Sequence, residues 1–137
     1  MKYLLDTNTC IAFLKGNQTV VEKIRLIGIE NLCLCSIVKA ELWFGACKSE
    51  RVTANQAVLK EFFAQFSSVP FDDNPIEYYG EIRALLSKAG KPIGANDFLI
   101  AAIAKANQLT LVTNNTREFI RVPDLLLEDW LIVEGDK

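Results

Sequence analysis

The sequence predicts an α/β fold in which helices cover both faces of one parallel sheet of four or five strands. Short apolar segments of strand length alternate along the chain with longer segments whose apolar residues recur every three or four positions. Glycine, proline and capping residues separate these segments, and no repeat or linker interrupts their order. Because parallel strands are joined by helical crossovers, the alternation predicts a three-layer α/β/α domain that spans residues 1–137.

The expected strands are short apolar runs that end at polar or turn-forming residues. They cover residues 2–5, 32–36, 69–71, 109–113 and 125–127. Pro70 indicates that the third run is an edge strand or a strand end, because proline has no amide proton for the ladder. The second run alternates cysteine with leucine. We expect the cysteines of the chain to be reduced core residues rather than a zinc site or a redox pair, since they have apolar neighbours and no CxxC spacing.

The expected helices lie between capping signals. They cover residues 9–15, 19–27, 37–47, 54–66, 75–89 and 98–106, with a single helical turn at 116–119. We expect Ser36 to cap the third helix, Thr53 to open a capping box before the fourth, and Pro75 to occupy the first helical position of the fifth. The segment 98–106 is almost continuously apolar, which predicts a buried helix.

The composition excludes several classes of chemistry. The chain has no histidine, so Ser-His-Asp and Cys-His nucleophile systems, HExxH zinc sites and Cys2His2 fingers are impossible within it. The net charge of −2 does not decide whether phosphate is a ligand. No apolar run reaches the roughly 18 residues of a membrane span, and no leader with a cleavage site opens the chain, so we expect a cytoplasmic protein.

Acidic and amide side chains follow the expected strands at their carboxyl ends, where open α/β sheets bind ligands. These residues are Asp6, Glu41, Asp97, Asn114, Asn115 and Glu118. Each alone has an ordinary explanation as a turn residue, a helix cap or a solvated acid, although apolar neighbours on its helix face predict partial burial of Glu41. Several carboxylates gathered without histidine would repel one another, and Mg²⁺ or Mn²⁺ would neutralise them through oxygen ligands. The pattern therefore predicts metal-dependent hydrolysis of a phosphodiester.

Several segments of the chain resemble the PIN-domain ribonucleases, specifically the VapC toxins of bacterial toxin–antitoxin modules. They are YLLDTN at 3–8, SIVKAEL and FGA at 36–46, GANDFLIAA at 94–102, LVTNNTREF at 111–119, and the closing RVP and EDW. They run from end to end in the order of the family. The resemblance implies a PIN-like α/β/α domain and the toxin component of a type II system, a magnesium-dependent endoribonuclease for which Mn²⁺ is an alternative metal.

The resemblance also implies roles for individual residues. It makes Asp6 and Asp97 the metal ligands, with Glu41 completing the shell or orienting water. Many relatives have an aspartate after the fourth strand, where this chain has two asparagines. The fourth member of the site is therefore one of the asparagines Asn114 and Asn115, of which Asn115 is the candidate catalytic residue, or Glu118. Further candidates are Thr113 and Arg117 for positioning a phosphate, and Lys15, Lys39, Lys48 and Arg51 for holding the RNA backbone.

The expected partners also follow from the resemblance. They are a co-encoded VapB-like antitoxin, a second copy of the chain in a homodimer, and an RNA substrate. DNA is contacted only through the antitoxin, and no membrane is involved. The Asn-Asn-x-Arg-Glu-Phe block and the closing Glu-Asp-Trp are similar to the branch whose members cut initiator tRNA in its anticodon region.

Two alternatives from other classes stay open: a PIN-fold module that binds nucleic acid or protein without catalysis, and a structure-specific DNA nuclease. A receiver-like phosphoacceptor domain would pair adjacent acids near the start of the chain, whereas Asp6 has no acidic neighbour. A haloacid-dehalogenase-type phosphatase needs Asp-x-Asp, and the chain has Asp6-Thr7-Asn8. Comparison of tRNA with branched DNA as substrates separates the two nucleases.

Overall fold

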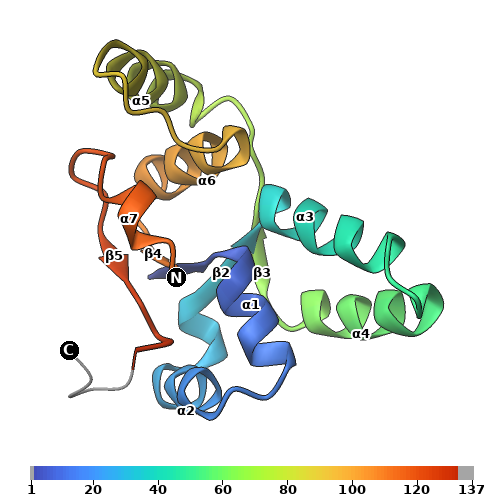
Figure 1. The fold of residues 1–137 in the computed structure, drawn as a ribbon. Coiled ribbons are helices and arrows are strands. Elements are labelled where there is room, and N and C mark those ends of the chain that lie inside the picture. The colour runs from blue at the N-terminus through green and yellow to red at the C-terminus, as the bar shows by residue number, and fades with distance from the viewer. Residues whose placement is uncertain (1, 133–137) are drawn as a thin grey trace.

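The computed structural model describes residues 2–132 and contains a five-stranded parallel sheet (Figure 1). The strands are β1 (Tyr3–Leu5), β2 (Leu32–Cys35), β3 (Ser67–Val69), β4 (Thr110–Val112) and β5 (Leu127–Glu128). Their order is β3-β2-β1-β4-β5, so that β1 is central and Leu4 is paired with Cys33 on one side and Leu111 on the other. The predicted three-layer fold with four or five parallel strands is confirmed.

Seven α-helices and a short 3-10 turn are described alongside the sheet. They are α1 (Thr7–Leu14), α2 (Gln18–Ile27), η1 (Ile29–Asn31), α3 (Ser36–Cys47), α4 (Val52–Ala64), α5 (Ile76–Lys88), α6 (Ala95–Ala106) and α7 (Thr116–Phe119). As drawn in Figure 1, α1 and α2 lie below the sheet, α5 and α6 lie above it, and α3 and α4 run side by side away from it. The layers leave the carboxyl ends of β1, β2 and β4 next to the first turns of α1, α3 and α7.

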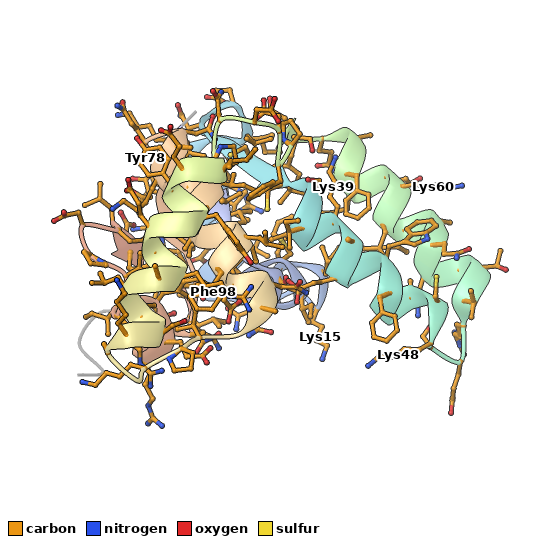
Figure 2. All side chains as sticks on the ribbon, turned by 90° about the horizontal axis from the view of Figure 1, so that it is seen from above. Lys15, Lys39, Lys48, Lys60, Tyr78 and Phe98 are labelled. Carbon is orange, nitrogen blue, oxygen red and sulfur yellow. The ribbon has the colours of Figure 1, made fainter. Side chains whose placement is uncertain are left out.

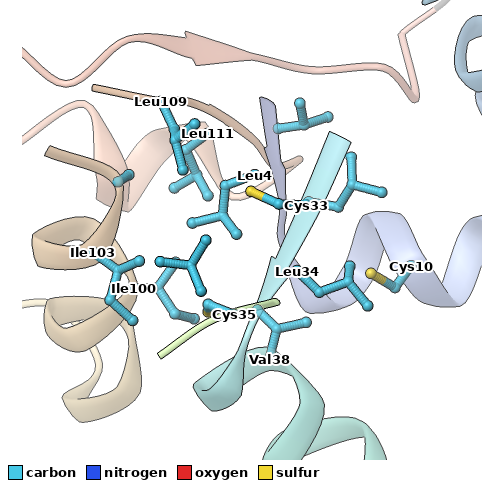
Figure 3. Packing of buried hydrophobic residues seen from close by; sticks show 14 of the residues in the cluster. Leu4, Cys10, Cys33, Leu34, Cys35, Val38, Ile100, Ile103, Leu109 and Leu111 are labelled. Atoms are coloured by element: carbon cyan, nitrogen blue, oxygen red, sulfur yellow. The ribbon is translucent and has the colours of Figure 1, made fainter. Parts of the chain in front are cut away.

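The core covers both faces of the sheet, and a large part of it lies between the sheet and α6. All four residues of β2 are buried, as are Leu4 and Leu5 of the central strand. Residues 100–104 of α6 are fully buried, and Figure 3 shows Ile100 and Ile103 packed toward Leu4 and Leu111. This burial confirms the prediction of a buried helix. It also fixes the N-terminus of α6, and with it Asp97, at the edge of the sheet.

The cysteine prediction is correct for three residues and wrong for one. All are free thiols, and Cys10, Cys33 and Cys35 are buried. Burial raises the pKa of Cys33 to about 12 and that of Cys35 to about 11, which keeps both thiols protonated. Cys47 is exposed because it is the last residue of α3, beyond the part of that helix that faces the core.

Several expected helix starts are displaced by one or two residues. Ser36 is the first residue of α3 rather than its cap, and its hydroxyl instead accepts a hydrogen bond from the Phe71 amide at 3.3 Å. The capping box at Thr53 is wrong because α4 already begins at Val52. Pro75 is the residue before α5, not its first member.

The bounds of the two edge strands differ from those predicted. The last strand covers residues 127–128 instead of 125–127, because Leu127 and Glu128 are the residues that pair with β4. β3 is an edge strand, as Pro70 indicated, but it covers Ser67–Val69 instead of residues 69–71, so that the proline follows the strand. Between residues 2 and 132, no helix combines the length and apolar character needed to cross a membrane.

Candidate active site

Four carboxylates from four different helices converge at the carboxyl edge of the sheet. Asp6 caps α1 directly after the central strand, and Glu41 lies in the second turn of α3. Asp97 lies in the first turn of α6, and Glu118 lies in the single turn of α7. The charges of Asp6, Glu41 and Glu118 all act on Asp97, which places the four side chains in one electrostatic neighbourhood.

Asp6 is buried, and each of its carboxylate oxygens accepts one hydrogen bond. Its side chain is 5% exposed. One carboxylate oxygen accepts from the backbone amide of Thr7 at 2.8 Å, and the other accepts from the hydroxyl of Thr113 at 2.7 Å. Burial raises the pKa of Asp6, and these two hydrogen bonds oppose that rise because they stabilise the ionised form. The site therefore holds a carboxylate whose orientation is fixed from both β1 and β4.

Thr113 orients Asp6 rather than a phosphate. Its side chain is fully buried, its hydroxyl donates to Asp6, and the same oxygen accepts from the Asn115 amide at 3.0 Å. The prediction that Thr113 positions a phosphate is therefore wrong, because the hydroxyl is not accessible to a ligand. Arg117, the other candidate for that role, is exposed.

Thr7 is a member of the site that the sequence analysis missed. Its hydroxyl donates to Glu41 at 2.9 Å, across 34 residues of sequence. This bond holds the half-buried Glu41 toward Asp6, since Thr7 is the next residue after Asp6. A threonine directly after the first-strand aspartate was a signal available in the sequence, but nothing there indicated its partner.

Asp97 has the most perturbed acidity of the site. Its pKa is raised to about 7, first by burial, then by a hydrogen bond with Glu118 and by the charges of Asp6, Glu118 and Glu41. The Asp97 carboxyl therefore keeps its proton to a higher pH than an ordinary aspartate does. Gly94 lies against it, because a Cβ at that position would be 3.1 Å from an Asp97 carboxylate oxygen.

The two asparagines after β4 have different positions. The side-chain amide of Asn115 donates to Glu118 at 2.5 Å, so Asn115 reaches the acidic cluster through Glu118. Asn114 is exposed and accepts a hydrogen bond from the side chain of Asn8 at 3.2 Å. Only Asn115 and Glu118 are thus brought to the acids, as the sequence analysis proposed for the fourth position.

The basic residues expected to border the site are divided between two surfaces. Lys15 lines a groove of about 680 Å³ together with Thr7 and Glu41, between α1, α3 and α4. Lys39 lies over the ring of Phe63 at 5.2 Å, and Lys48 lies over Phe44 at 5.0 Å. Figure 2 shows Lys15 and Lys48 along one edge of the molecule and Lys39 on the other side of α3.

The donor set fits a hard divalent cation in its chemistry. It consists of oxygen atoms only, and Asp97 resists ionisation partly because its neighbours are negative, a repulsion that a cation would remove. Within residues 2–132, no three acidic or cysteine side chains are placed so that they already share a coordination position. Coordination of one ion by three of these carboxylates therefore needs a rearrangement of side chains, while each hydrogen-bonded oxygen keeps a further lone pair for a ligand bond.

The molecule is thus an α/β/α domain with a parallel sheet and a group of acidic side chains at the carboxyl edge of that sheet. The PIN domain family matches residues 3–125. The chain is 42% identical over 132 residues to Ribonuclease VapC2 of Rickettsia felis, which covers 95% of this chain and 98% of the relative. It is 37% identical over 130 residues to the tRNA(fMet)-specific endonuclease VapC of Salmonella typhimurium. That match covers 95% of this chain and 98% of the relative.

Solved structures agree with these relatives. The toxin chain of DNA-bound VapBC from Salmonella typhimurium superimposes with a TM-score of 0.90 at 38% identity, covering 95% of this chain and 98% of that chain. The structure of VapBC2 from Rickettsia felis, bound to a DNA fragment from the promoter, superimposes with a TM-score of 0.89 at 41% identity. The match covers 95% of this chain and 99% of that chain. The chain belongs to the PIN-domain family, and within it to the VapC ribonucleases, which confirms the resemblance seen in the sequence.

Proposed function

We propose that this chain is the toxin of a type II toxin–antitoxin pair and hydrolyses RNA with Mg²⁺, for which Mn²⁺ can substitute. The observation that carries the proposal is the convergence of Asp6, Glu41, Asp97 and Glu118 in a centre without histidine, where Asp97 has a pKa of about 7. Repulsion between these carboxylates is unfavourable without a cation, and a bound cation would remove that repulsion. Asp6 and Asp97 are the proposed ligands.

The other residues of the centre prepare these ligands and the water. Thr113 holds the buried carboxylate of Asp6 in one orientation from β4. Glu41, held by the Thr7 hydroxyl at 2.9 Å, has a second carboxylate oxygen with which to orient a water molecule or complete the metal shell. Asn115 donates to Glu118 and limits its rotation away from Asp97. The bound cation would supply a more acidic water and stabilise charge on the phosphoryl oxygens.

The proposed substrate is a tRNA cut in its anticodon region. Two relatives at 37–38% identity are named tRNA(fMet)-specific endonucleases, and the chain shares their length over nearly the whole sequence. A tRNA substrate places the proposed activity in the cytoplasm. Single-stranded anticodon loops present splayed bases and an accessible backbone, which suits an open groove beside the acids.

The proposed partners are a small VapB-like antitoxin and a second copy of the chain. The neighbouring structures are VapBC complexes, and two of them include DNA. We propose that this chain likewise contacts DNA only through its antitoxin. The groove lined by Thr7, Lys15 and Glu41 lies next to the acids, so a protein segment seated in it would block the site.

Purified, antitoxin-free protein incubated with total RNA and Mg²⁺ tests the proposal. We expect cleavage that EDTA abolishes, and 5′ ends that map to a tRNA anticodon region. Asp97→Asn provides the inactive control. Cleavage of branched DNA but not RNA would establish the structure-specific DNA nuclease instead, and neither metal binding nor cleavage would establish a non-catalytic module.

A further inference from the structure

A second, polar pocket lies beside the acidic centre. It has a volume of about 580 Å³ and is lined by Asn8, Ile11, Ala12, Lys15, Gly16, Asn17 and Asn114. This volume is within the range of small-ligand sites. Ile11 and Lys15 also line the groove that contains Glu41, so the two hollows adjoin along α1.

The residues that form this pocket are attached to those that hold the acidic centre. Asn8 is two residues after Asp6, and Asn114 directly follows Thr113, whose hydroxyl donates to Asp6. A hydrogen bond of 3.2 Å joins the Asn8 amide to the Asn114 carbonyl oxygen. A molecule that contacts this asparagine pair therefore contacts residues one or two positions from Thr113 and Asp6.

The asparagine pair has hydrogen-bonding capacity beyond the bond that joins it. That bond uses one N–H of Asn8 and the carbonyl of Asn114, whereas the two amides together carry four N–H hydrogens and two carbonyl oxygens. Asn114 is exposed, and so is Asn8. Paired donors and acceptors at the wall of a pocket match the edge of a nucleobase, which asparagine recognises through two hydrogen bonds.

The opposite wall suits a phosphate and leaves room for a ring. Lys15 is exposed at the end of α1, and Figure 2 shows its side chain extending outward there. Gly16 follows with a φ of +80° and no atom within 4 Å of where its Cβ would lie, so the turn between α1 and α2 leaves this space open. The Asn17 side chain is held in place because its Oδ1 accepts a hydrogen bond from the Val20 amide at 3.1 Å.

We propose that this pocket binds one single-stranded nucleotide next to the cut, with Asn8 and Asn114 recognising its base and Lys15 holding its phosphate. The proposal rests on the ribonuclease function given above. It assigns sequence preference at one flanking position to two amides that lie outside the acidic cluster. The polar lining distinguishes this pocket from the apolar groove beside it, which is lined by Leu14, Leu42, Val58 and Leu59.

The test measures base preference in a set of anticodon stem–loop RNAs. Each of the four bases is placed in turn at the two positions that flank the cut, and kcat/KM is measured with Mg²⁺ for the wild type, Asn8→Ala, Asn114→Ala and Lys15→Ala. Asn107→Ala is the matched control. Asn107 is an exposed asparagine at the C-terminal end of α6, the end opposite to Asp97. The ratio between the best and the worst base is the readout, because it is independent of the folded fraction of each variant.

We expect the wild type to prefer one base at one flanking position, and each asparagine variant to lower that ratio by about fivefold or more. Lys15→Ala should raise KM severalfold and keep the ratio, and Asn107→Ala should change neither. An unchanged ratio in both asparagine variants overturns the proposal, and so does a wild type without preference. Loss of antitoxin affinity with an unchanged ratio would make the pocket a protein contact. Absence of any RNA cleavage by the wild type would instead refute the ribonuclease function itself.

Discussion

At the scale of single residues, the site depends on side chains that hold the acids in place. Asp6 is buried, and it remains a usable carboxylate because each of its oxygens accepts a hydrogen bond. Thr113 supplies the one side-chain donor in this arrangement and has no exposed surface of its own. Removal of that donor therefore tests the arrangement without changing any acidic residue.

Thr113→Val should lower activity by about 10–100-fold and stability by about 1–3 kcal/mol, because a buried carboxylate loses a donor. The pKa of Asp6 should rise further, since the Thr113 hydrogen bond opposes the effect of burial. Melting curves and the acid limb of the pH–rate profile measure these effects. Thr113→Ser should restore both, and Thr110→Val at the start of the preceding strand β4 should change neither. Normal activity in Thr113→Val would show that Asp6 needs no support from β4.

Asp97→Asn should abolish cleavage by at least about 100-fold and stabilise the metal-free protein. The folded pKa of Asp97, about 7, lies above its ordinary value of 3.8. The unfolding free energy of the wild type should therefore fall as the pH rises from about 4 to about 7, where only the unfolded chain is ionised. Because this carboxyl is half-exposed, the change should amount to about 1–2 kcal/mol.

Melting temperatures between pH 4 and 8, measured in EDTA, check this prediction. The slope over that range should be weaker in Asp97→Asn than in the wild type. Addition of Mg²⁺ should flatten the wild-type slope, because a cation offsets the neighbouring negative charges. Parallel slopes for the two proteins, or full Mg²⁺-dependent activity in the variant, would contradict the role assigned to Asp97.

Glu118→Gln decides which residue completes the site. Glu118 touches both Asp97 and Asn115, so it is either a fourth acid of the centre or a residue that only positions Asp97. A loss of activity similar to that of Asp97→Asn is the expected result, with weaker Mg²⁺ binding measured by calorimetry. A rate within about threefold of the wild type would place Glu118 outside the chemistry.

At the scale of elements, the start of α6 connects the core to the site. The fully buried residues 100–104 fix the helix against the sheet, and Gly94 caps it with extended backbone angles that other residues also adopt. A side chain at Gly94 would nevertheless approach an Asp97 carboxylate oxygen to 3.1 Å. The absence of a side chain at this cap therefore serves Asp97 rather than the backbone.

Gly94→Ala should weaken Mg²⁺ binding and cleavage severalfold while costing less than about 1 kcal/mol of stability, since the loss of a glycine cap is a small change. Gly80→Ala is the matched control, because a Cβ at Gly80, inside α5, meets no atom within 4 Å. This control should be stabilised by about 0.5–1 kcal/mol with activity unchanged. Equal activity of the two variants would contradict the contact between position 94 and Asp97.

The order and type of the elements could be predicted from periodicity and punctuation, whereas their ends could not. The apolar α6 and the buried β2 have unambiguous patterns. Ser36 and Thr53 failed as caps because each belongs to a helix that begins earlier than its capping signal suggests. The Ser36 hydroxyl is instead bonded to the Phe71 amide, a residue 35 positions away that no local pattern identifies.

At the scale of the whole molecule, the acids could be predicted because parallel strands place their carboxyl ends together. This rule predicted the grouping of Asp6, Glu41, Asp97 and Glu118. It did not predict the hydrogen bonds of Thr7 and Thr113. Both bonds depend on distances between segments that only the folded chain determines. The different positions of Asn114, which lines the polar pocket, and Asn115, which is bonded to Glu118, have the same origin. Neighbouring residues in a turn face different ways.

Expression of the chain alone should stop bacterial growth, and co-expression with its antitoxin should restore it. Asp97→Asn should be harmless when expressed alone at the same level, because the toxicity comes from RNA cleavage. Growth curves, with the level of each protein checked by immunoblot, measure this outcome. Harmless overexpression of folded wild-type protein that purifies without a small partner would count against a toxin.

The central position of β1 also bears on how the protein is made. Asp6 precedes its hydrogen-bond donor Thr113 by 107 residues, and Thr113 directly follows the strand that pairs with β1 from the other side. A nascent chain that stops before β4 has neither this donor nor the turn that carries Glu118. We therefore expect the acidic centre to stay incomplete during translation until β4 and α7 have been synthesised.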